Sequence, residues 1–181
     1  MINTATEINS STGVGDAAPT AAPATITFAD FGLDPKIQKA VLEQGYNTPT
    51  PIQAQSIPHV LAGSDLMGAA QTGTGKTAAF VLPIIQKILR HASNSASPAR
   101  HPIRALVLTP TRELAVQVAE NAASYSKYTD LRAAVVYGGV DMKEQVATLR
   151  NGVEILIATP GRLLDHIGSK VANLSQVEIL V

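Results

Sequence analysis

The chain has 181 residues, 45% hydrophobic and 15% charged, so it can bury one substantial core and one domain is expected. Its 14 basic and 14 acidic residues cancel, but four acidic residues and no basic one lie in residues 1–35, so residues 36–181 hold 14 basic against 10 acidic residues, a net charge of +4. Such a body is mildly basic and not a polycation, so any nucleic acid must be held by local groups and not by a bulk field. The absence of cysteine excludes disulfides and thiolate metal sites, and it favours a reducing compartment.

The amino-terminal segment, residues 1–25, is rich in Ala, Thr, Ser and Pro and cannot bury enough apolar surface to order itself. We therefore predict a disordered tail there and one folded domain over residues 26–181. The segment lacks a basic region followed by an apolar stretch, and no apolar run in the chain reaches the length of a membrane span. A cytoplasmic protein without membrane contact is expected.

Beyond the tail, apolar segments typical of strands alternate with amphipathic segments typical of helices. The predicted strands are 66–70, 105–109, 133–137, 155–158 and 179–181. The predicted helices are 77–90, 112–128, 142–150 and 162–167, and 91–102 is predicted to be a surface loop. Continuous apolar strands separated by helices favour an α/β fold, in which a parallel sheet is covered on both faces.

The run from Ala70 to Thr77, AQTGTGKT, has the spacing of a phosphate-binding loop between a strand and a helix. Gly73 and Gly75 leave backbone N–H groups free to converge on phosphate oxygens at a helix start. Lys76 would reach the β- and γ-phosphates, and the Thr77 hydroxyl would ligate Mg²⁺. Ala70 stands where the first glycine of this pattern is usual, and the alternative is a glycine-rich turn without a ligand.

Two later segments share the form Thr-Pro-x-Arg, at residues 109–112 and 159–162, and each follows an apolar strand. Thr is a good N-cap and Pro a good first helical residue, so either segment alone could be a helix start and nothing more. In a parallel sheet, however, both would present N–H groups and an arginine at the same edge as the phosphate loop, which suits a linear polyanion. Gly138 and Gly139, after another strand, could add a close backbone approach.

Motif by motif, residues 28–181 resemble the first RecA-like domain of the DEAD-box RNA helicases of bacteria. Residues 45–53, GYNTPTPIQ, resemble the Q motif of that family, and Phe28 stands at its upstream aromatic position. The resemblance implies that Gln53 hydrogen-bonds the adenine edge and that Phe28 stacks on the ring; taken alone, residues 49–51 would be a turn before a short helix. Residues 70–77 resemble motif I, whose usual form begins with alanine. The implied ATP-binding residues are Phe28, Tyr46, Gln53, Gln71, Thr72, Gly73, Thr74, Gly75, Lys76 and Thr77.

Three further motifs follow in the order of that family. Residues 110–114, PTREL, resemble motif Ia, residues 138–139 the GG motif, and residues 159–162 motif Ib. In the family these motifs grip the sugar-phosphate backbone of single-stranded RNA. The implied RNA-binding residues are Pro110, Thr111, Arg112, Gly138, Gly139, Thr159, Pro160, Gly161 and Arg162.

The next element of the family, a strand ending in Asp-Glu-Ala-Asp, would begin where this sequence stops. The Ser-Ala-Thr motif and the second RecA-like domain of the family are also missing. In that fold, the strand that leads to the Ser-Ala-Thr motif lies between the phosphate-loop strand and the strand ending at Val181. We therefore expect the amino-terminal fragment of an ATP-dependent RNA helicase, which alone neither hydrolyses ATP nor unwinds RNA. The alternatives are a non-catalytic module that binds ATP and RNA, and a P-loop kinase or small-molecule ATPase, which needs neither Gln53 nor the Thr-Pro-x-Arg pair.

Overall fold

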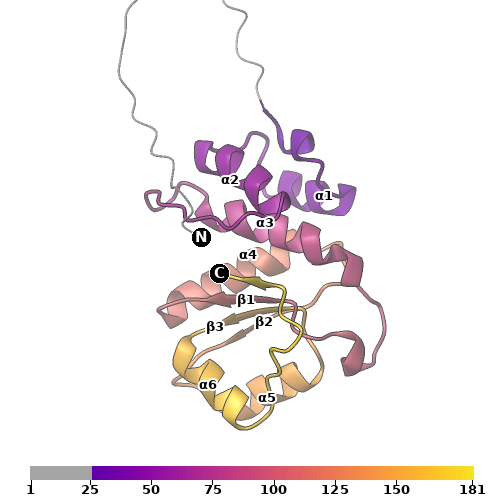
Figure 1. Cartoon of the computed structure of the whole chain (residues 1–181), viewed down its shortest axis with the longest axis vertical. Helices are drawn as coiled ribbons and strands as arrows, with labels where there is room; N and C mark the ends of the chain where they lie inside the picture. Colours follow the sequence, from indigo (N-terminus) through magenta and orange to yellow (C-terminus); the bar gives the residue numbers. More distant parts are fainter. Residues whose placement is uncertain (1–25) are drawn as a thin grey trace, which may run out of the picture.

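The computed structural model describes residues 26–181, and the predicted tail, residues 1–25, lies outside the described residues. Within residues 26–181 the strands form one parallel sheet in the order β2-β3-β1-β4, flanked by helices on both faces (Figure 1). The strands are β1 (Ala105–Leu108), β2 (Ala133–Val136), β3 (Ile155–Ala158) and β4 (Ile179–Leu180). The helices are α1 (Pro35–Glu43), α2 (Pro51–Leu61), α3 (Lys76–Ile88), α4 (Arg112–Tyr125), α5 (Met142–Arg150) and α6 (Pro160–Gly168). The predicted α/β parallel-sheet class is confirmed.

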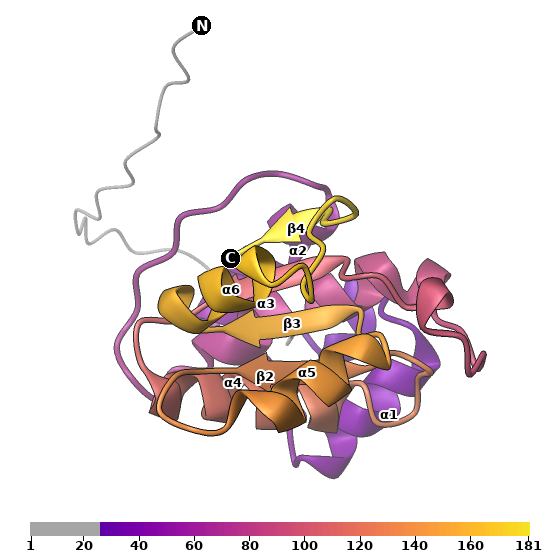
Figure 2. The ribbon, with the colours of Figure 1, turned by 90° about the horizontal axis from the view of Figure 1, so that it is seen from below.

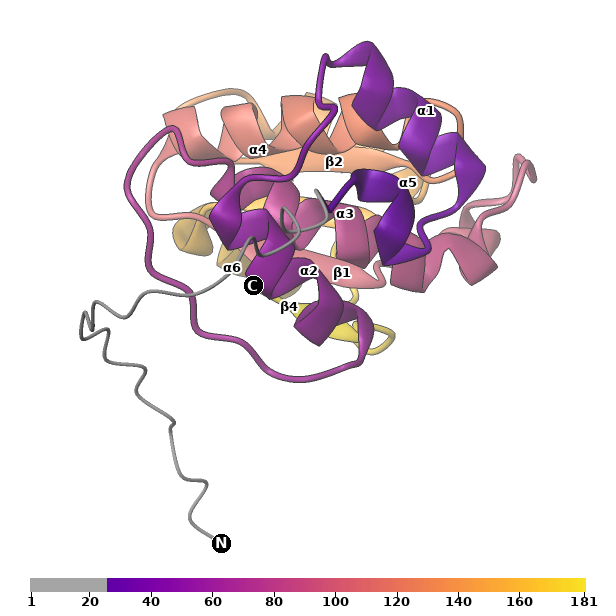
Figure 3. The same cartoon turned by 90° about the horizontal axis from the view of Figure 1, so that it is seen from above.

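Successive strand residues point to opposite faces of the sheet, and this alternation divides the core into two layers. Ala105 and Val107 of β1 belong to the cluster that α1, α2, α3 and α4 complete, while Leu106 belongs to the cluster completed by α5 and α6. Figures 2 and 3 show the two helical layers from opposite sides. A sheet buried on both faces explains why its strands read as continuous apolar runs.

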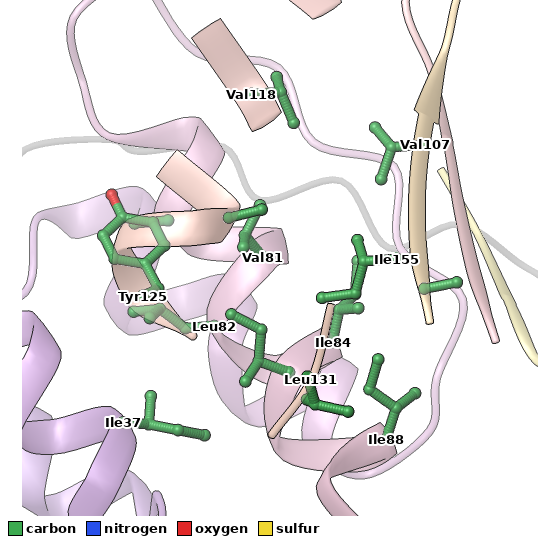
Figure 4. Packing of buried hydrophobic residues seen from close by; sticks show 14 of the residues in the cluster. Ile37, Val81, Leu82, Ile84, Ile88, Val107, Val118, Tyr125, Leu131 and Ile155 are labelled. Carbon is green, nitrogen blue, oxygen red and sulfur yellow. The ribbon is translucent and has the colours of Figure 1, made fainter. Parts of the chain in front are cut away.

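The larger core layer is built mainly from α3, whose apolar residues pack with those of α2, α4 and the sheet. Leu82 and Ile85 are fully buried, and Figure 4 shows Leu82 among side chains from α1, α4 and the sheet. Burying one such side chain contributes about 1.5 to 3 kcal/mol to folding. This packing fixes the position of α3, and therefore of the loop that precedes it.

The predicted strand at 66–70 is wrong, because the structure has no regular secondary structure from Ser64 to Gln71. Leu66 is 47% and Met67 99% exposed, and the segment belongs to a long loop between α2 and α3 that arcs outside the sheet (Figure 3). A strand forms only where neighbouring backbone accepts and donates hydrogen bonds. Among the described residues none pairs with this segment, and the edge of β4 away from β1 is also unpaired.

The other predicted helices and strands are present: 142–150 and 155–158 have the predicted bounds, and the rest have ends shifted by one to three residues. The helix predicted to reach residue 128 ends at Tyr125, and its C-cap Ser126 donates its hydroxyl to the carbonyl of Ala122 at 2.8 Å. Helix α3 gives way to a 3-10 turn at Leu89–His91, and a second such turn, Pro98–Arg100, interrupts the predicted surface loop. Between residues 26 and 181, no helix is long and apolar enough to cross a membrane.

Candidate ATP and RNA site

The phosphate loop leads directly into α3, and its two inner glycines have left-handed backbone conformations. Gly73 has a φ of +79° and Gly75, the N-cap of α3, a φ of +87°. Non-glycine residues adopt this region only at a cost, so the sequence places glycine where the turn requires it. The backbone N–H groups in the first turn of α3 have no intrahelical partner, and Gly75 offers no capping side chain. The loop is therefore an N–H-rich concavity of the kind that binds phosphate.

Lys76 and Thr77, the predicted catalytic pair, stand on the first turn of α3. The Lys76 ammonium donates to the backbone carbonyls of Ala70 and Gln71, the latter at 2.6 Å, so the loop curls around its own lysine. Both residues line a cavity of about 460 Å³ together with Leu108 at the end of β1. The start of α3 thus faces the carboxyl-terminal edge of the sheet.

Gln53 ties the predicted Q motif to the phosphate loop. Its side chain is 3% exposed, its Nε2 donates to the carbonyl of Gly75 at 3.1 Å, and its Oε1 accepts from the backbone N–H of Thr50 at 2.9 Å. The Thr50 hydroxyl donates to the carbonyl of Thr74 at 2.8 Å. An amide has two N–H groups and two lone pairs, so one of each is unused by these contacts, although the side chain is as deeply buried as that of Phe28.

The two aromatic residues assigned to the base lie differently. Phe28 is 4% exposed and packs edge to face on Phe31, with ring centroids 5.9 Å apart, so little of its ring is free for stacking. Tyr46 is 39% exposed and lies beside Tyr125 of α4, at 6.3 Å between centroids. Burial, and then the hydrogen bond to Tyr46, raise the pKa of Tyr125, so the phenol of Tyr125 stays neutral.

The remaining residues of the predicted phosphate loop are accessible. Thr74 is half-buried and its hydroxyl donates to the carbonyl of Gln71 at 2.7 Å, which closes the turn. The exposed members of the loop are Gln71, Thr72 and Gly73.

The first predicted RNA motif caps α4 at the end of β1. The Thr111 hydroxyl accepts from the backbone N–H of Leu114 at 3.3 Å, so this threonine is a true N-cap. Arg112 is exposed beside it. A surface hollow of about 470 Å³ joins this helix start to the loops after β2 and β3, and it is lined by Pro110, Thr111, Arg112, Glu113, Gly138, Gly139 and Thr159. The structure therefore brings residues of all three predicted RNA motifs to one place.

The loop after β2 is in contact with arginines from both neighbouring motifs. Gly139 has a φ of +83°, and a Cβ there would lie 2.6 Å from Nη1 of Arg112. Nη2 of Arg162 donates to the carbonyl of Val140 at 3.1 Å. The Arg162 side chain is only 11% exposed, and its Nε and Nη1 are buried without a hydrogen-bond partner in the described chain. Close to it, the start of α6 exposes Pro160 and Gly161 and leaves Thr159 half-buried.

Three residues of the site were not among the predicted ones. Thr50 could have been found, since Thr-x-x-Gln is a capping-box pattern at a helix start. Gln145 and His166 carry no sequence signal of their own, and only the packing of α5 against α6 brings them beneath the loop after β2.

No acidic residue stands at the carboxyl end of any strand within residues 26–181, where Thr109, Tyr137, Thr159 and Val181 follow the four strands. Glu154 and Glu178 instead precede β3 and β4 at the opposite edge. The described residues therefore bring the backbone N–H groups of the α3 start and the Thr77 hydroxyl to this edge, but they place no carboxylate at the strand ends there.

Comparisons with known proteins agree with this geometry. Residues 50–181 match the model of the DEAD/DEAH box helicase family. The chain is 47% identical over 154 residues to the ATP-dependent RNA helicase CshA of Listeria monocytogenes, covering 85% of this chain and 28% of that protein. It is 45% identical over 161 residues to the ATP-dependent RNA helicase DeaD of Mycobacterium tuberculosis, and this match covers 88% of this chain and 27% of that protein. The chain thus spans little more than a quarter of these relatives, and it belongs to the DEAD/DEAH box helicase family.

Proposed function

We propose that the protein is the ATP- and RNA-binding part of an ATP-dependent RNA helicase that acts in the cytoplasm. One observation carries the proposal: the phosphate loop and three strand-end loops with exposed helix starts and arginines converge on the same edge of the sheet. Helix starts bind anions, and one edge that binds both a polyphosphate and a sugar-phosphate chain can couple the two. The relatives are named ATP-dependent RNA helicases, which supports the same assignment.

On the nucleotide side, Lys76 would exchange its loop carbonyls for phosphate oxygens, and Thr77 would give its hydroxyl to Mg²⁺. Bound Mg²⁺ supplies charge neutralisation for phosphoryl transfer from ATP to water. The backbone of residues 71–75 would hold the remaining phosphate oxygens. The proposed base side of the site consists of Phe28, Tyr46 and Gln53.

On the RNA side, the hollow between the three motifs would hold backbone phosphates of a single strand. The contacts are to phosphate and sugar, so they fix position without reading sequence. The proposed contacts are Pro110, Thr111, Arg112, Gly138, Gly139, Thr159, Pro160, Gly161 and Arg162.

Turnover requires groups that the described residues do not place at this edge, above all a carboxylate beside the Mg²⁺ site. We therefore assign duplex unwinding to a longer protein that contains this chain, and binding alone to residues 1–181. A purely non-catalytic ATP and RNA module is the second candidate, favoured by the same lack of an acidic residue. RNA-stimulated phosphate release by the protein extended along its reading frame, abolished by Lys76→Ala, supports the helicase. The same activity in residues 1–181 alone would mean that the catalytic carboxylate lies within this chain.

Base choice tests the nucleotide side. With its free N–H and lone pair, Gln53 can pair with the exocyclic amine and a ring nitrogen of adenine, whereas guanine reverses that pattern. Each buried polar group left unpaired costs about 1 to 3 kcal/mol, so ATP should bind at least about fivefold more tightly than GTP. Gln53→Ala should remove this preference in equilibrium binding of fluorescent nucleotides. Equal affinities for ATP and GTP in the unmutated protein would exclude the role proposed for Gln53.

Salt dependence tests the RNA side. Binding to single-stranded RNA oligonucleotides of different sequence should weaken alike as salt rises. Arg112→Ala should reduce the slope of log affinity against log salt by about 0.7, the value for one phosphate contact on a single strand. Arg150→Ala, at the far end of α5, is the matched control and should leave affinity and slope unchanged. A strong sequence preference that disappears in Arg162→Ala would contradict a backbone-only track.

A further inference from the structure

Beneath the loop after β2 lies a buried chain of two hydrogen bonds that joins three elements. Nε2 of Gln145, on α5, donates to the carbonyl of Tyr137 at 3.0 Å. Oε1 of the same amide lies 3.2 Å from Nε2 of His166, on α6. Gln145 is 8% exposed and His166 is fully buried. The helix that carries motif Ib is thus linked through α5 to the residue immediately before Gly138 and Gly139.

The chemistry of the partners fixes the direction of this chain. The Tyr137 carbonyl can only accept, so the NH₂ group of Gln145 must face it and the amide oxygen must face the histidine. His166 must then carry its proton on Nε2, and its buried Nδ1 is an acceptor without a partner in the described chain. Burial and then the Arg162 charge lower the pKa of His166 against an opposing effect of Asp165, which agrees with a neutral ring.

The same loop is held from its other end. Nη2 of Arg162 donates to the carbonyl of Val140, so the two carbonyls that flank the glycine pair, those of Tyr137 and Val140, are both anchored from α5 and α6. Glycines contribute no side-chain packing and lose the most conformational entropy when they are fixed. A rigid glycine pair at this place therefore depends on its flanking anchors.

We infer that Gln145 and His166 are positioning residues for RNA backbone binding: they hold Gly138 and Gly139 in register with motif Ib without touching RNA. The effect on RNA binding rests on the proposed function, whereas the anchoring of the loop is a property of the free protein. It assigns a role to two buried polar residues that no strand-end motif includes. Without the hydrogen bonds of Gln145, the loop at Gly138 and Gly139 becomes mobile. RNA binding must then include the entropic cost of ordering this loop, which weakens the affinity.

The first test measures the loop without RNA. In the full chain, the NMR order parameters of the backbone at residues 138–140 should be about 0.85. They should fall below about 0.6 in Gln145→Met, because methionine keeps the side-chain volume but has no N–H donor. Gln145→Glu should behave alike, because a carboxylate cannot donate to the Tyr137 carbonyl. Thr148→Ala, on the exposed face of α5, should change nothing. An unchanged loop in both Gln145 variants would overturn the inference.

The second test separates positioning from contact. Gln145→Met should weaken binding of a single-stranded oligouridylate about 3- to 10-fold, the value of one or two lost hydrogen bonds, with the salt slope of the unmutated chain. A reduced slope would mean a phosphate contact and would contradict the inference. His166→Gln, which retains an N–H donor, should bind the oligouridylate more tightly than His166→Leu, which has none. If the unmutated chain binds no RNA, the proposed function fails while the NMR result still decides the anchoring.

Discussion

The two edges of the sheet use their polar groups in opposite ways. At the amino-terminal edge, polar residues just before the strands are bonded to one another: His101, Arg132 and Glu154 form one buried network there. At the carboxyl-terminal edge, loops with glycines at positive φ, capped helix starts and arginines border open hollows. The first arrangement stabilises the protein, whereas the second leaves donors available for a ligand.

In the amino-terminal network the side chains of His101 and Glu154 are bonded at every polar atom. Nδ1 of His101 lies 2.5 Å from Oε1 of Glu154, and its Nε2 lies 2.8 Å from the carbonyl of Ser95. Oε2 of Glu154 accepts from the backbone N–H of Arg132 at 2.8 Å. Both ring nitrogens of His101 and both carboxylate oxygens of Glu154 therefore have partners within the network. Nothing in this network is left to bind a ligand.

The largest effect should come from breaking that network. Glu154→Ala removes one partner of a fully buried pair, and we expect it to lower the free energy of unfolding by about 3 to 5 kcal/mol in urea denaturation. Glu154→Gln is the matched control: its amide can donate to Nδ1 of a neutral His101 and still accept from Arg132. It should cost less than about 1 kcal/mol. Equal losses in the two variants would show that charge, and not the closed hydrogen bonding, holds this edge.

At the carboxyl-terminal edge, two glycines of the phosphate loop offer a comparison of nearly equal backbone strain. A Cβ at Gly73 would meet nothing within 4 Å, whereas a Cβ at Gly75 would collide with Nε2 of Gln53 and lie 3.3 Å from the Thr50 hydroxyl. Gly73→Ala should cost about 1 to 2 kcal/mol of stability from its φ alone. Gly75→Ala should cost about 1 to 3 kcal/mol more, by displacing Gln53, and should also weaken ATP binding.

Thermal unfolding and fluorescent nucleotide binding of both variants check this expectation. If Gly73→Ala and Gly75→Ala behave alike in both measurements, the hydrogen bond from Gln53 to the phosphate loop contributes neither to stability nor to ATP binding.

The contrast between the edges also explains which parts of the protein could be predicted from sequence. Strand cores such as 155–158 depend on local pattern and lie where the pattern places them, and AQTGTGKT leads into a helix as predicted, although an irregular loop and not a strand precedes it. The segment 66–70 has an equally apolar pattern, but a strand needs a partner, and periodicity does not show whether one is present. Sequence predicted what a segment could form, and pairing decided what it did form.

The buried polar residues were the least predictable. His101 and Glu154 are 53 positions apart, and Gln145 and His166 are 21 apart, so neither pair has a spacing that indicates contact. The same packing explains why glycine is needed at position 152. Gly152 has a φ of +82°, and a Cβ there would lie 2.6 Å from Cβ of His101. Such contacts arise only when the helices have packed on the sheet, which makes them tertiary properties.

A smaller effect at the amino-terminal edge depends on pH. Glu178, just before β4, pairs with Arg90 at 2.6 Å, His91 at 2.8 Å and Arg104 at 3.0 Å. Partial burial raises the pKa of this carboxyl, but His91, Arg90 and Arg104 outweigh it, so the pKa lies below 4.5. The stabilisation is therefore present above about pH 4.5 and is lost as the pH falls through the lowered value.

Because the cluster lies at the surface, with the Arg90 side chain 68% and the Glu178 side chain 30% exposed, it should contribute about 1 kcal/mol or less. Urea midpoints of the unmutated chain and of Glu178→Gln should differ at pH 7, and the difference should shrink as the pH falls below 4.5. A difference that does not change with pH would assign the effect to packing instead of charge.

The smallest expected effect is a gain in stability at the end of α6. Lys170 is the one non-glycine residue with positive φ in the described part of the chain, at +57°, two residues beyond Gly168. The backbone N–H of Val171 donates to the carbonyl of His166 at 2.9 Å, so this is a helix C-terminal turn that favours glycine. Lys170→Gly should raise the free energy of unfolding by about 0.5 to 1 kcal/mol, and the melting temperature by about 1 to 4 °C. Glu120→Gly, at an exposed position inside α4, should instead cost about 1 kcal/mol, and a loss of stability in both variants would mean that no strain is stored at Lys170.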